Sequence, residues 1–242
     1  MRKQDYFDMW IELWLNPTQI EEILCSILWV SKADFFKLTE ISSRFIYEVQ
    51  KAFYATHSWT PEAYTLQKSE FFSRDFFVDQ RVLIPRSETE LLVEEALKKI
   101  NRTGKVDTSI YIDVWTGSSC IATSIIAEIH PLKFHTCFAL DISPEALEVA
   151  RKNISNHVDW KIELRESNLL EAVFHEEVFS KKNLFITANL PYIKDDDHEN
   201  MWVDVVKHEP DWALYGWAET WFEMYEKLIK QCFQMKKIHN IS

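Results

Sequence analysis

Residues 185–192 read Phe-Ile-Thr-Ala-Asn-Leu-Pro-Tyr, an apolar run that ends in groups able to hold a planar amine. The side-chain oxygen of Asn189 and the backbone carbonyl of Leu190 can each accept one N–H of an NH2 group. An amide nitrogen attacks a methyl group poorly unless it is positioned and polarised, so two such acceptors would turn its remaining lobe toward the methyl donor. Pro191 stiffens the turn, and Tyr192 offers a wall for a planar group. The segment predicts methyl transfer to an amide or exocyclic amine, with an ordinary strand end and turn as the alternative.

The order of segments upstream is typical of a nucleoside-binding α/β fold. Residues 109–114 read as a buried strand, residues 115–119 as a loop of mostly small residues, and residues 120–128 as a helix. A second apolar run, 136–140, ends in Asp141, where an acidic side chain meets ribose hydroxyls in such folds. In isolation Asp141 could equally be a strand-end cap. The order of strand, loop, helix, strand and acid favours ribose binding.

These segments belong to a longer ordered set that is similar to the HemK-type release-factor glutamine methyltransferases. The matching stretches are Trp-Thr-Pro-Glu-Ala-Tyr (59–64), Val-Leu-Ile-Pro-Arg-Ser-Glu-Thr-Glu (82–90), Ile-Asp-Val-Trp-Thr-Gly-Ser-Ser (112–119), Ala-Leu-Asp-Ile-Ser-Pro-Glu-Ala-Leu (139–147), Ala-Asn-Leu-Pro-Tyr-Ile (188–193) and Glu-Pro-Asp-Trp-Ala-Leu-Tyr-Gly (209–216). The resemblance implies methyl transfer from S-adenosylmethionine to the glutamine amide of the Gly-Gly-Gln tripeptide in peptide chain release factors. It also implies a Rossmann-like class I methyltransferase domain.

The resemblance carries site residues onto particular positions. The implied catalytic residues are Asn189, Leu190, Pro191 and Tyr192. The implied cofactor-binding residues are Asp113, Trp115, Thr116, Gly117, Ser118, Ser119, Asp141, Asn168, Leu169 and Asn189. Within this set, residues 116–118 would line the methionine side, Asp141 would hold the ribose, and residues 168–169 would border the adenine. Arg86 and Glu88 would either orient the carboxylate end of the cofactor or buttress their loop, and Glu209 and Pro210 could be structural.

The chain departs from the family pattern in three places. Leu190 replaces the first proline of the usual Asn-Pro-Pro-Tyr, which keeps the accepting carbonyl but leaves a less rigid turn. Trp115 and Ser119 stand at the first and third glycines of the usual loop Asp-x-Gly-Thr-Gly-x-Gly. The sequence stops at Ser242, where the family continues into two more strands, so a C-terminally truncated sheet is expected.

The tryptophans have an unusual distribution. The chain has 3 Gly and 10 Trp in 242 residues, whereas about 17 Gly would be ordinary at roughly 7%. Trp59, Trp115, Trp217 and Trp221 fall where the resemblance expects glycine, and Trp29 is placed with them. We therefore hypothesise that the gene reads UGA as glycine and that the printed sequence reads it as tryptophan. The alternative is genuine glycine loss in a decaying enzyme.

Composition restricts the remaining possibilities. A net charge of -11 and a pI near 5.2 argue against broad binding to nucleic-acid phosphates. The four cysteines show no metal-ligand or Cys-x-x-Cys spacing, so they are expected to be reduced and no metal site is expected. No apolar stretch approaches membrane-spanning length, and the first residues lack a signal-peptide core. The sequence thus predicts a cytoplasmic protein, with no membrane partner and no strong nucleic-acid binding, that acts as a monomer.

The chain divides into two predicted domains. Residues 1–73 form a small helical bundle for recognition of the protein substrate, with apolar stripes at Ile20, Ile23, Leu24, Ile27, Leu28 and at Phe45, Ile46, Val49, Phe53, and with a Ser31-capped helix through Leu38. Residues 74–242 form the methyltransferase domain, joined by a hairpin near 71–84 around Asp79 and Gln80. This domain opens with a helix over 88–100 that turns Leu92, Ala96, Leu97 and Ile100 inward. Ser143 caps a later helix that begins at Pro144.

Two other functions remain open from the residues alone. A nucleic-acid adenine-N6 methyltransferase would use Asn-Leu-Pro-Tyr equally well for an exocyclic amine. The acidic charge, the helical N-terminal region and the Ile-Pro-Arg-Ser-Glu-Thr-Glu segment favour a protein substrate instead. A non-catalytic remnant that binds partners without the cofactor is suggested by Trp115 and the early stop.

Overall fold

A computed structural model describes residues 3, 17–42, 45, 48, 49, 52, 60–104, 106–129, 134–159, 161–179, 182–191, 209, 210 and 222–239. The chain forms two compact units, residues 1–68 and 69–242. The predicted boundary after residue 73 would place the first strand of the hairpin in the N-terminal domain.

The first unit contains α2 (Pro17–Leu28), α3 (Lys32–Phe35) and α5 (Glu62–Leu66). Ile20, Ile23, Leu24 and Leu28 are buried along one face of α2, as their helical spacing predicts. The Ser31 hydroxyl accepts the Asp34 N–H at 3.1 Å and caps α3, but this helix ends at Phe35 and does not reach Leu38. Ile46 and Phe53 of the predicted third stripe lie outside the described residues. The complete helical bundle therefore stays a prediction.

The second unit opens with a short antiparallel hairpin. Strand β1 (Ser69–Phe71) pairs with β2 (Arg74–Phe76), with Ser69 opposite Phe76. Its turn is Phe72-Ser73, with φ of +50° and +58°, so the predicted turn at Asp79 and Gln80 is misplaced. Asp79 instead pairs with the nearby Arg81 at 2.7 Å, outside either strand. This turn could not be recognised from residue types, since residues other than Gly, Asn or Asp seldom occupy such a turn.

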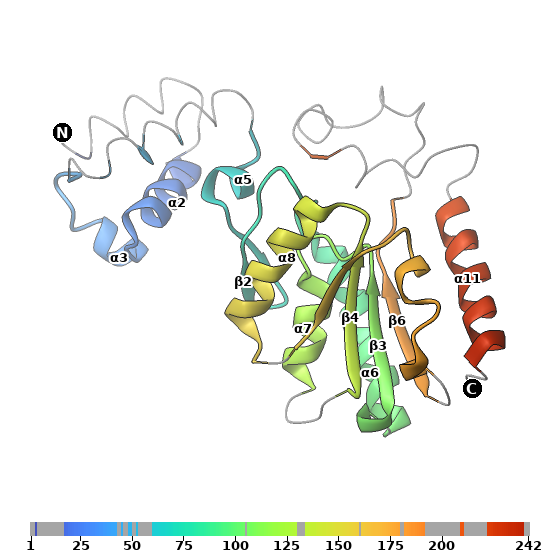
Figure 1. Ribbon diagram of the computed structural model, residues 1–242. Helices are drawn as coiled ribbons and strands as arrows, with labels where there is room; N and C mark the ends of the chain where they lie inside the picture. The colour runs from blue at the N-terminus through green and yellow to red at the C-terminus, as the bar shows by residue number, and fades with distance from the viewer. Residues whose placement is uncertain are drawn as a thin grey trace. The chain divides into compact units, whose positions relative to one another are not determined.

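A parallel four-stranded sheet forms the centre of this unit, in the order β5-β4-β3-β6 (Figure 1). Its strands are β3 (Ser109–Val114), β4 (Thr136–Asp141), β5 (Glu163–Glu166) and β6 (Asn183–Ala188). The helices are α6 (Glu90–Thr103), α7 (Cys120–Glu128), α8 (Pro144–His157) and α11 (Glu223–His239), with short 3-10 turns η2 (Ser87–Thr89), η3 (Val106–Thr108), η4 (Glu171–Val173) and η5 (Glu177–Phe179). The parallel α/β architecture is Rossmann-like, as predicted.

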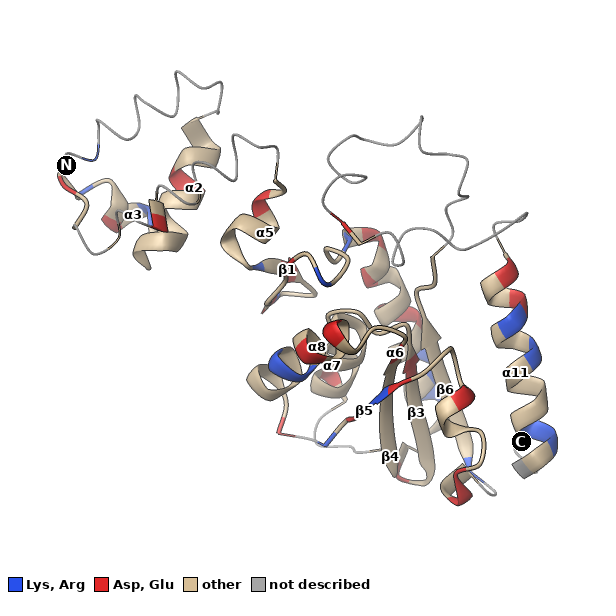
Figure 2. Ribbon diagram, turned by 45° about the horizontal axis from the view of Figure 1, so that its top comes forward, with Lys and Arg blue, Asp and Glu red and all other residues tan. Residues whose placement is uncertain are grey.

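Apolar residues cover both faces of the sheet. Tyr111 of β3 packs with residues of α6 and α7, whereas Ile110, Ile112 and Val114 pack toward Leu228 and Met235 of α11. A strand covered on both faces reads as a continuous apolar run, which is why β3 is recognisable in the sequence. Figure 2 shows acidic and basic residues along α8 and α11. Among the described residues, no helix is long and apolar enough to span a membrane.

The helix that opens the second unit differs in detail from the prediction. A 3-10 turn precedes α6, so the α-helix begins at Glu90 and not at Glu88. Val93 and Ile100 are its fully buried residues, whereas Leu92, Ala96 and Leu97 are partly buried against the same cluster. The predicted stripe omitted Val93, although it shares the inward face with Ala96, Leu97 and Ile100 at helical spacing.

Candidate functional site

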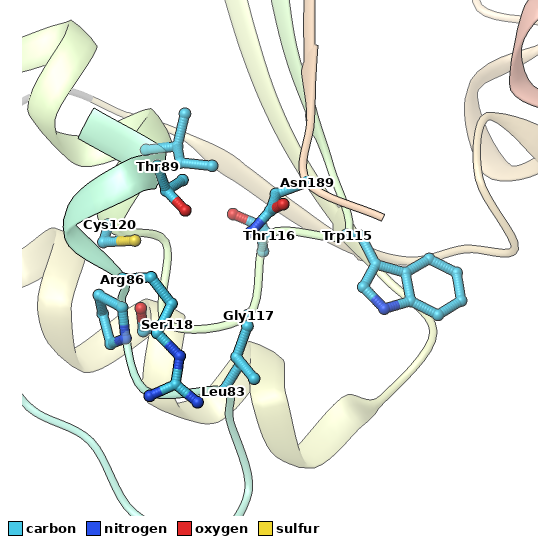
Figure 3. Close-up of a pocket in the computed structure, with 11 residues that line it drawn as sticks. Leu83, Arg86, Thr89, Trp115, Thr116, Gly117, Ser118, Cys120 and Asn189 are labelled. Carbon is cyan, nitrogen blue, oxygen red and sulfur yellow. The ribbon is translucent and has the colours of Figure 1, made fainter. Parts of the chain in front are cut away.

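A pocket lies where three separate segments meet beside the carboxyl ends of β3 and β6 (Figure 3). The segments are the loop before α6, the loop between β3 and α7, and the residue that follows β6. The lining residues are Leu83, Pro85, Arg86, Thr89, Trp115, Thr116, Gly117, Ser118, Cys120, Ile121 and Asn189. Because ligands of open parallel sheets bind outside the carboxyl ends of the strands, this is the expected position for a nucleoside.

The β3–α7 loop is shaped by a buried carboxylate beneath it. Asp113 accepts hydrogen bonds from the hydroxyls of Thr116 and Thr187, each at 2.6 Å, and Tyr111 adds a 2.6 Å bond to Thr187. Burial raises the pKa of Asp113 to about 6, although these hydrogen bonds oppose the rise. Asp113 is fully buried and is not among the pocket-lining residues, so the structure places it as a support for the loop. Direct contact of Asp113 with a cofactor stays a prediction.

A second carboxylate ties the same loop to the neighbouring strand. Asp141, at the end of β4, accepts the Gly117 N–H at 2.8 Å and the Ser143 N–H at 3.0 Å. Burial raises the pKa of Asp141 to about 6, and the backbone hydrogen bonds act in the opposite direction. The carboxylate lies against the β3–α7 loop, but it is fully buried, already holds the loop amide and is not among the pocket-lining residues, so ribose binding stays a prediction. A ribose would have to share or replace the Gly117 bond.

The side chain of Asn153 also supports the loop, and the sequence analysis missed it. Asn153 of α8 donates to the carbonyls of Ser118 and Phe77, each at 2.9 Å, and accepts the Phe77 N–H at 2.7 Å. It is fully buried on the apolar face of α8. A polar residue on an otherwise apolar helix face was the available signal, because a buried amide must find partners.

Asn189 enters the pocket from the end of β6 and lies near Thr116 in Figure 3. The next residue, Leu190, is buried, and its N–H donates to the Tyr225 hydroxyl of α11 at 3.2 Å. No sequence motif pointed to Tyr225, which follows Leu190 by 35 positions. Pro191 is buried, and Tyr192 lies outside the described residues. The structure therefore brings Asn189 and the loop residues together.

The Arg86 side chain links the pocket rim to a distant segment. Its Nη2 lies 2.6 Å from Oε1 of Glu209, whose side chain is only 1% exposed. Burial raises the pKa of Glu209 and the Arg86 guanidinium opposes the rise. The other oxygen, Oε2, is buried without a hydrogen-bond partner among the described residues. Glu88 is exposed and receives a bond from Ser87, so Arg86 is the member of this motif that reaches the pocket.

The structure does not bring the predicted adenine-bordering residues into this pocket. Asn168 donates to Glu171 at 3.1 Å, and Leu169 is fully buried in the apolar cluster that includes α11. Neither residue lines the pocket, so contact with adenine stays a prediction. Within the described part of the chain, no group of His, Cys, Asp and Glu residues is arranged to hold a metal ion.

The parallel sheet and the pocket at its carboxyl edge define a Rossmann-like α/β domain, and the sequence relatives of this chain are methyltransferases. A release factor glutamine methyltransferase of Dictyoglomus turgidum (strain DSM 6724 / Z-1310) is 32% identical over 220 residues, which cover 88% of this chain and 74% of that protein. A second, from Chlorobaculum tepidum, is 36% identical over 69% of this chain. The chain belongs to the release factor glutamine methyltransferase family, which confirms the resemblance.

Other comparisons add detail. The chain spans 56% and 59% of the lengths of the relatives from Chlorobaculum tepidum and Koribacter versatilis. A bifunctional methyltransferase of Rickettsia prowazekii is 31% identical over 73% of this chain and 36% of its own length. A ribosomal protein L11 methylase structure from Lactobacillus delbrueckii subsp. bulgaricus is 26% identical, with a TM-score of 0.35 and 47% and 51% of the two chains covered. No family model matches the chain.

Proposed function

We propose that this chain transfers a methyl group from S-adenosylmethionine to the side-chain amide nitrogen of the glutamine in the Gly-Gly-Gln tripeptide of a peptide chain release factor. The observation that carries the proposal is the position of Asn189, which lines one pocket with the loop residues Thr116, Gly117 and Ser118. The relatives named release factor glutamine methyltransferase support the choice of a glutamine amide.

The loop residues fit the cofactor in two respects. A Cβ added at Gly117 would meet no heavy atom within 4 Å, so there is open space beside the loop backbone. Asp141 lies within hydrogen-bond distance of that loop and has lone pairs left for a ribose hydroxyl. Thr116, Gly117, Ser118 and Asp141 would hold the cofactor, whose sulfonium supplies an electrophilic methyl group when it is bound.

The residues after β6 would hold the other reactant. The Asn189 side-chain oxygen and the Leu190 carbonyl would accept the two N–H groups of the glutamine amide and turn its lone pair toward the methyl. The bond from Leu190 N to Tyr225 holds this turn in place, which compensates in part for the missing first proline. The amide nitrogen would form its bond to the methyl carbon as the methyl–sulfur bond breaks, S-adenosylhomocysteine would leave, and one amide proton would pass to solvent. Catalysis would then consist mainly of positioning and polarisation, because the substrate nitrogen is itself the nucleophile.

The first compact unit, residues 1–68, is the candidate for recognition of the release factor. A substrate that is itself a folded protein needs contacts beyond a single glutamine side chain, and a separate unit can provide them. The cytoplasmic location and the monomeric state predicted from the sequence belong to the same proposal.

Methylation of adenine in a nucleic acid is less well supported. The names of the sequence relatives point to release factors, and the net charge of -11 opposes contact with phosphates. Both activities can be measured in one experiment with methyl-labelled S-adenosylmethionine. We expect label on a release factor, none on the same factor with the tripeptide glutamine changed to glutamate, and none on RNA or DNA. Label on nucleic acid alone would replace the proposal, and label on no substrate by a cofactor-binding chain would contradict it.

A further inference from the structure

The backbone at both described tryptophans adopts a conformation that suits glycine. Trp29 has φ of +57° and Trp115 has φ of +64°, and the two described glycines, Gly104 and Gly117, have φ of +63° and +53°. Only a few per cent of non-glycine residues have positive φ, and Asn, Asp and His are enriched among them, whereas bulky residues are outliers. The described tryptophans and glycines therefore share one backbone conformation in this chain.

Trp29 follows the last residue of α2 in a hydrogen-bonded helix end. The Val30 N–H donates to the Cys25 carbonyl at 3.1 Å, and the Trp29 N–H donates to the Ser26 carbonyl at 3.3 Å. This pair of bonds is the Schellman motif, in which the residue after the helix is left-handed and is usually glycine. The Trp29 side chain is 90% exposed, so it makes little contact that would offset the strained backbone.

Trp115 has both a strained backbone and an unpaired polar atom. The bond from Thr116 N to the Leu140 carbonyl, at 2.9 Å, and that from Gly117 N to Asp141 fix the backbone immediately after Trp115. The indole Nε1 is buried without a hydrogen-bond partner among the described residues. Leaving such a donor unpaired destabilises a fold, and glycine at this position would remove it.

We infer that residues 29 and 115 are glycine in the protein made by its own cell, because UGA codons are read there as glycine and appear in the printed sequence as tryptophan. One codon reassignment explains the positive φ at both positions, the unpaired indole nitrogen, and the ratio of 3 Gly to 10 Trp. The inference does not depend on the proposed function. For the site, it means only that the β3–α7 loop has a second glycine, at position 115.

The other left-handed residues provide an internal control. Gln67, Phe72, Ser73, Ser119 and Leu169 also have positive φ, but a change in the meaning of UGA cannot alter them. Positive φ alone therefore does not mark a residue as a recoded glycine. The inference applies only to the tryptophans, and it requires these five residues to be the same in the native protein.

The test is the codon together with the native peptide. We expect UGA at codons 29 and 115, and tandem mass spectrometry of protein from its own cells should show glycine at both positions. Cleavage after Lys105 and Lys133 gives one peptide that contains positions 115, 117 and 119, so an ordinary glycine and Ser119 are read in the same spectrum. A UGG codon, or tryptophan in either native peptide, would overturn the inference.

A folding measurement on the recombinant full chain tests the backbone argument separately. Trp29→Gly should raise the folded-to-unfolded ratio about fivefold or more, since a left-handed non-glycine residue is strained. Trp29→Ala removes the indole but keeps a Cβ, so it should recover little of this gain. Equal gains from the two variants would attribute the effect to the ring and would contradict the argument from φ.

Discussion

The loops that follow β3 and β4 both connect a strand to a helix, but different kinds of contact hold their backbones. Both leave a parallel strand at its carboxyl end and enter a helix. After β4, Ser143 has an ordinary φ of -95° and caps α8 by accepting the Ala146 N–H at 3.1 Å. After β3, the residue at the start of α7 is Ser119, with φ of +65° and no capping bond from its side chain. The loop after β4 is determined by adjacent residues, whereas the loop after β3 is held by distant ones.

The distant contacts of the β3–α7 loop come from three other elements. Asp113 holds Thr116 from below, Asp141 holds the Gly117 amide from β4, and Asn153 holds the Ser118 carbonyl from α8. The conformation of this loop is therefore fixed by distant residues and needs no local turn sequence. The difference implies that changes in the distant contacts should cost more than changes in the local cap.

The largest predicted effect is on turnover, and it comes from Asn189 at the end of β6 and not from either loop. Asn189→Ala should lower turnover about 100- to 1000-fold, because loss of one positioned polar partner costs about 2.7 to 4 kcal/mol of transition-state stabilisation. Affinity for S-adenosylhomocysteine, measured by calorimetry, should stay near normal if the loops hold the cofactor. Asn101→Ala, a change at an exposed position of α6 outside the pocket, is the matched control. Near-normal turnover by Asn189→Ala would show that the amide is held elsewhere.

The contact between Asp141 and the Gly117 amide can be tested through the pH dependence of folding stability. Its folded pKa of about 6 lies above the ordinary 3.8, so the folded state binds this proton more tightly. The resulting stability is fully present below about pH 4 and is lost as pH rises through 6. Asp141→Asn should therefore flatten the stability profile between these values by up to about 3 kcal/mol, at about 1.4 kcal/mol per pKa unit. Chemical denaturation of both forms at several pH values would measure the change, and identical slopes would contradict it.

The ion pair on the pocket rim should have the next largest effect. Glu209→Gln removes the charge that faces Arg86 and should cost about 1 to 3 kcal/mol of folding stability. Arg86 is 40% exposed, so the loss should be smaller than for a fully buried pair. Glu148, which is 64% exposed and pairs with Arg81, provides the control: Glu148→Gln should cost less than about 1 kcal/mol. Equal losses would mean that burial of Glu209 adds nothing.

The smallest predicted changes in folding stability are at the starts of α8 and α7, and they should have opposite signs. Ser143→Ala should cost about 1 kcal/mol of stability through loss of the cap, with little change in cofactor affinity. Ser119→Gly should gain up to about 1 kcal/mol, because glycine adopts positive φ without strain. Thermal or urea unfolding would measure both. A loss of stability in Ser119→Gly would mean that its hydroxyl contact with Thr123, at 3.3 Å, matters more than the backbone.

Local patterns in the sequence were sufficient for the elements that are determined locally. The apolar runs at β3 and β4, the helix α7 and the Ser143 cap were predicted because each depends on neighbouring residues. The hairpin turn at Phe72 and Ser73 was not, since neither residue type favours positive φ.

The residues of the candidate site also fall into those that local motifs indicate and those that act through distant partners. Asn189 and the loop residues could be placed from motifs. Asn153 and Tyr225 act through partners far along the chain, and no local pattern indicates such contacts. The pairing of Arg86 with Glu209, across 123 positions, could not be predicted for the same reason.

The hydrogen bond from Leu190 to Tyr225 also has a consequence for the order of folding during synthesis. All four strands of the sheet have been made once residue 188 is added, but α11, which packs on one face of the sheet and supplies the bond to Leu190, has not. Helix α11 must be made and must dock before the turn is fixed, which is a slow, non-local step. The hydrogen bonds of the β3–α7 loop need no residue beyond 187, whereas the turn that carries Asn189 is fixed only after Tyr225 has been made.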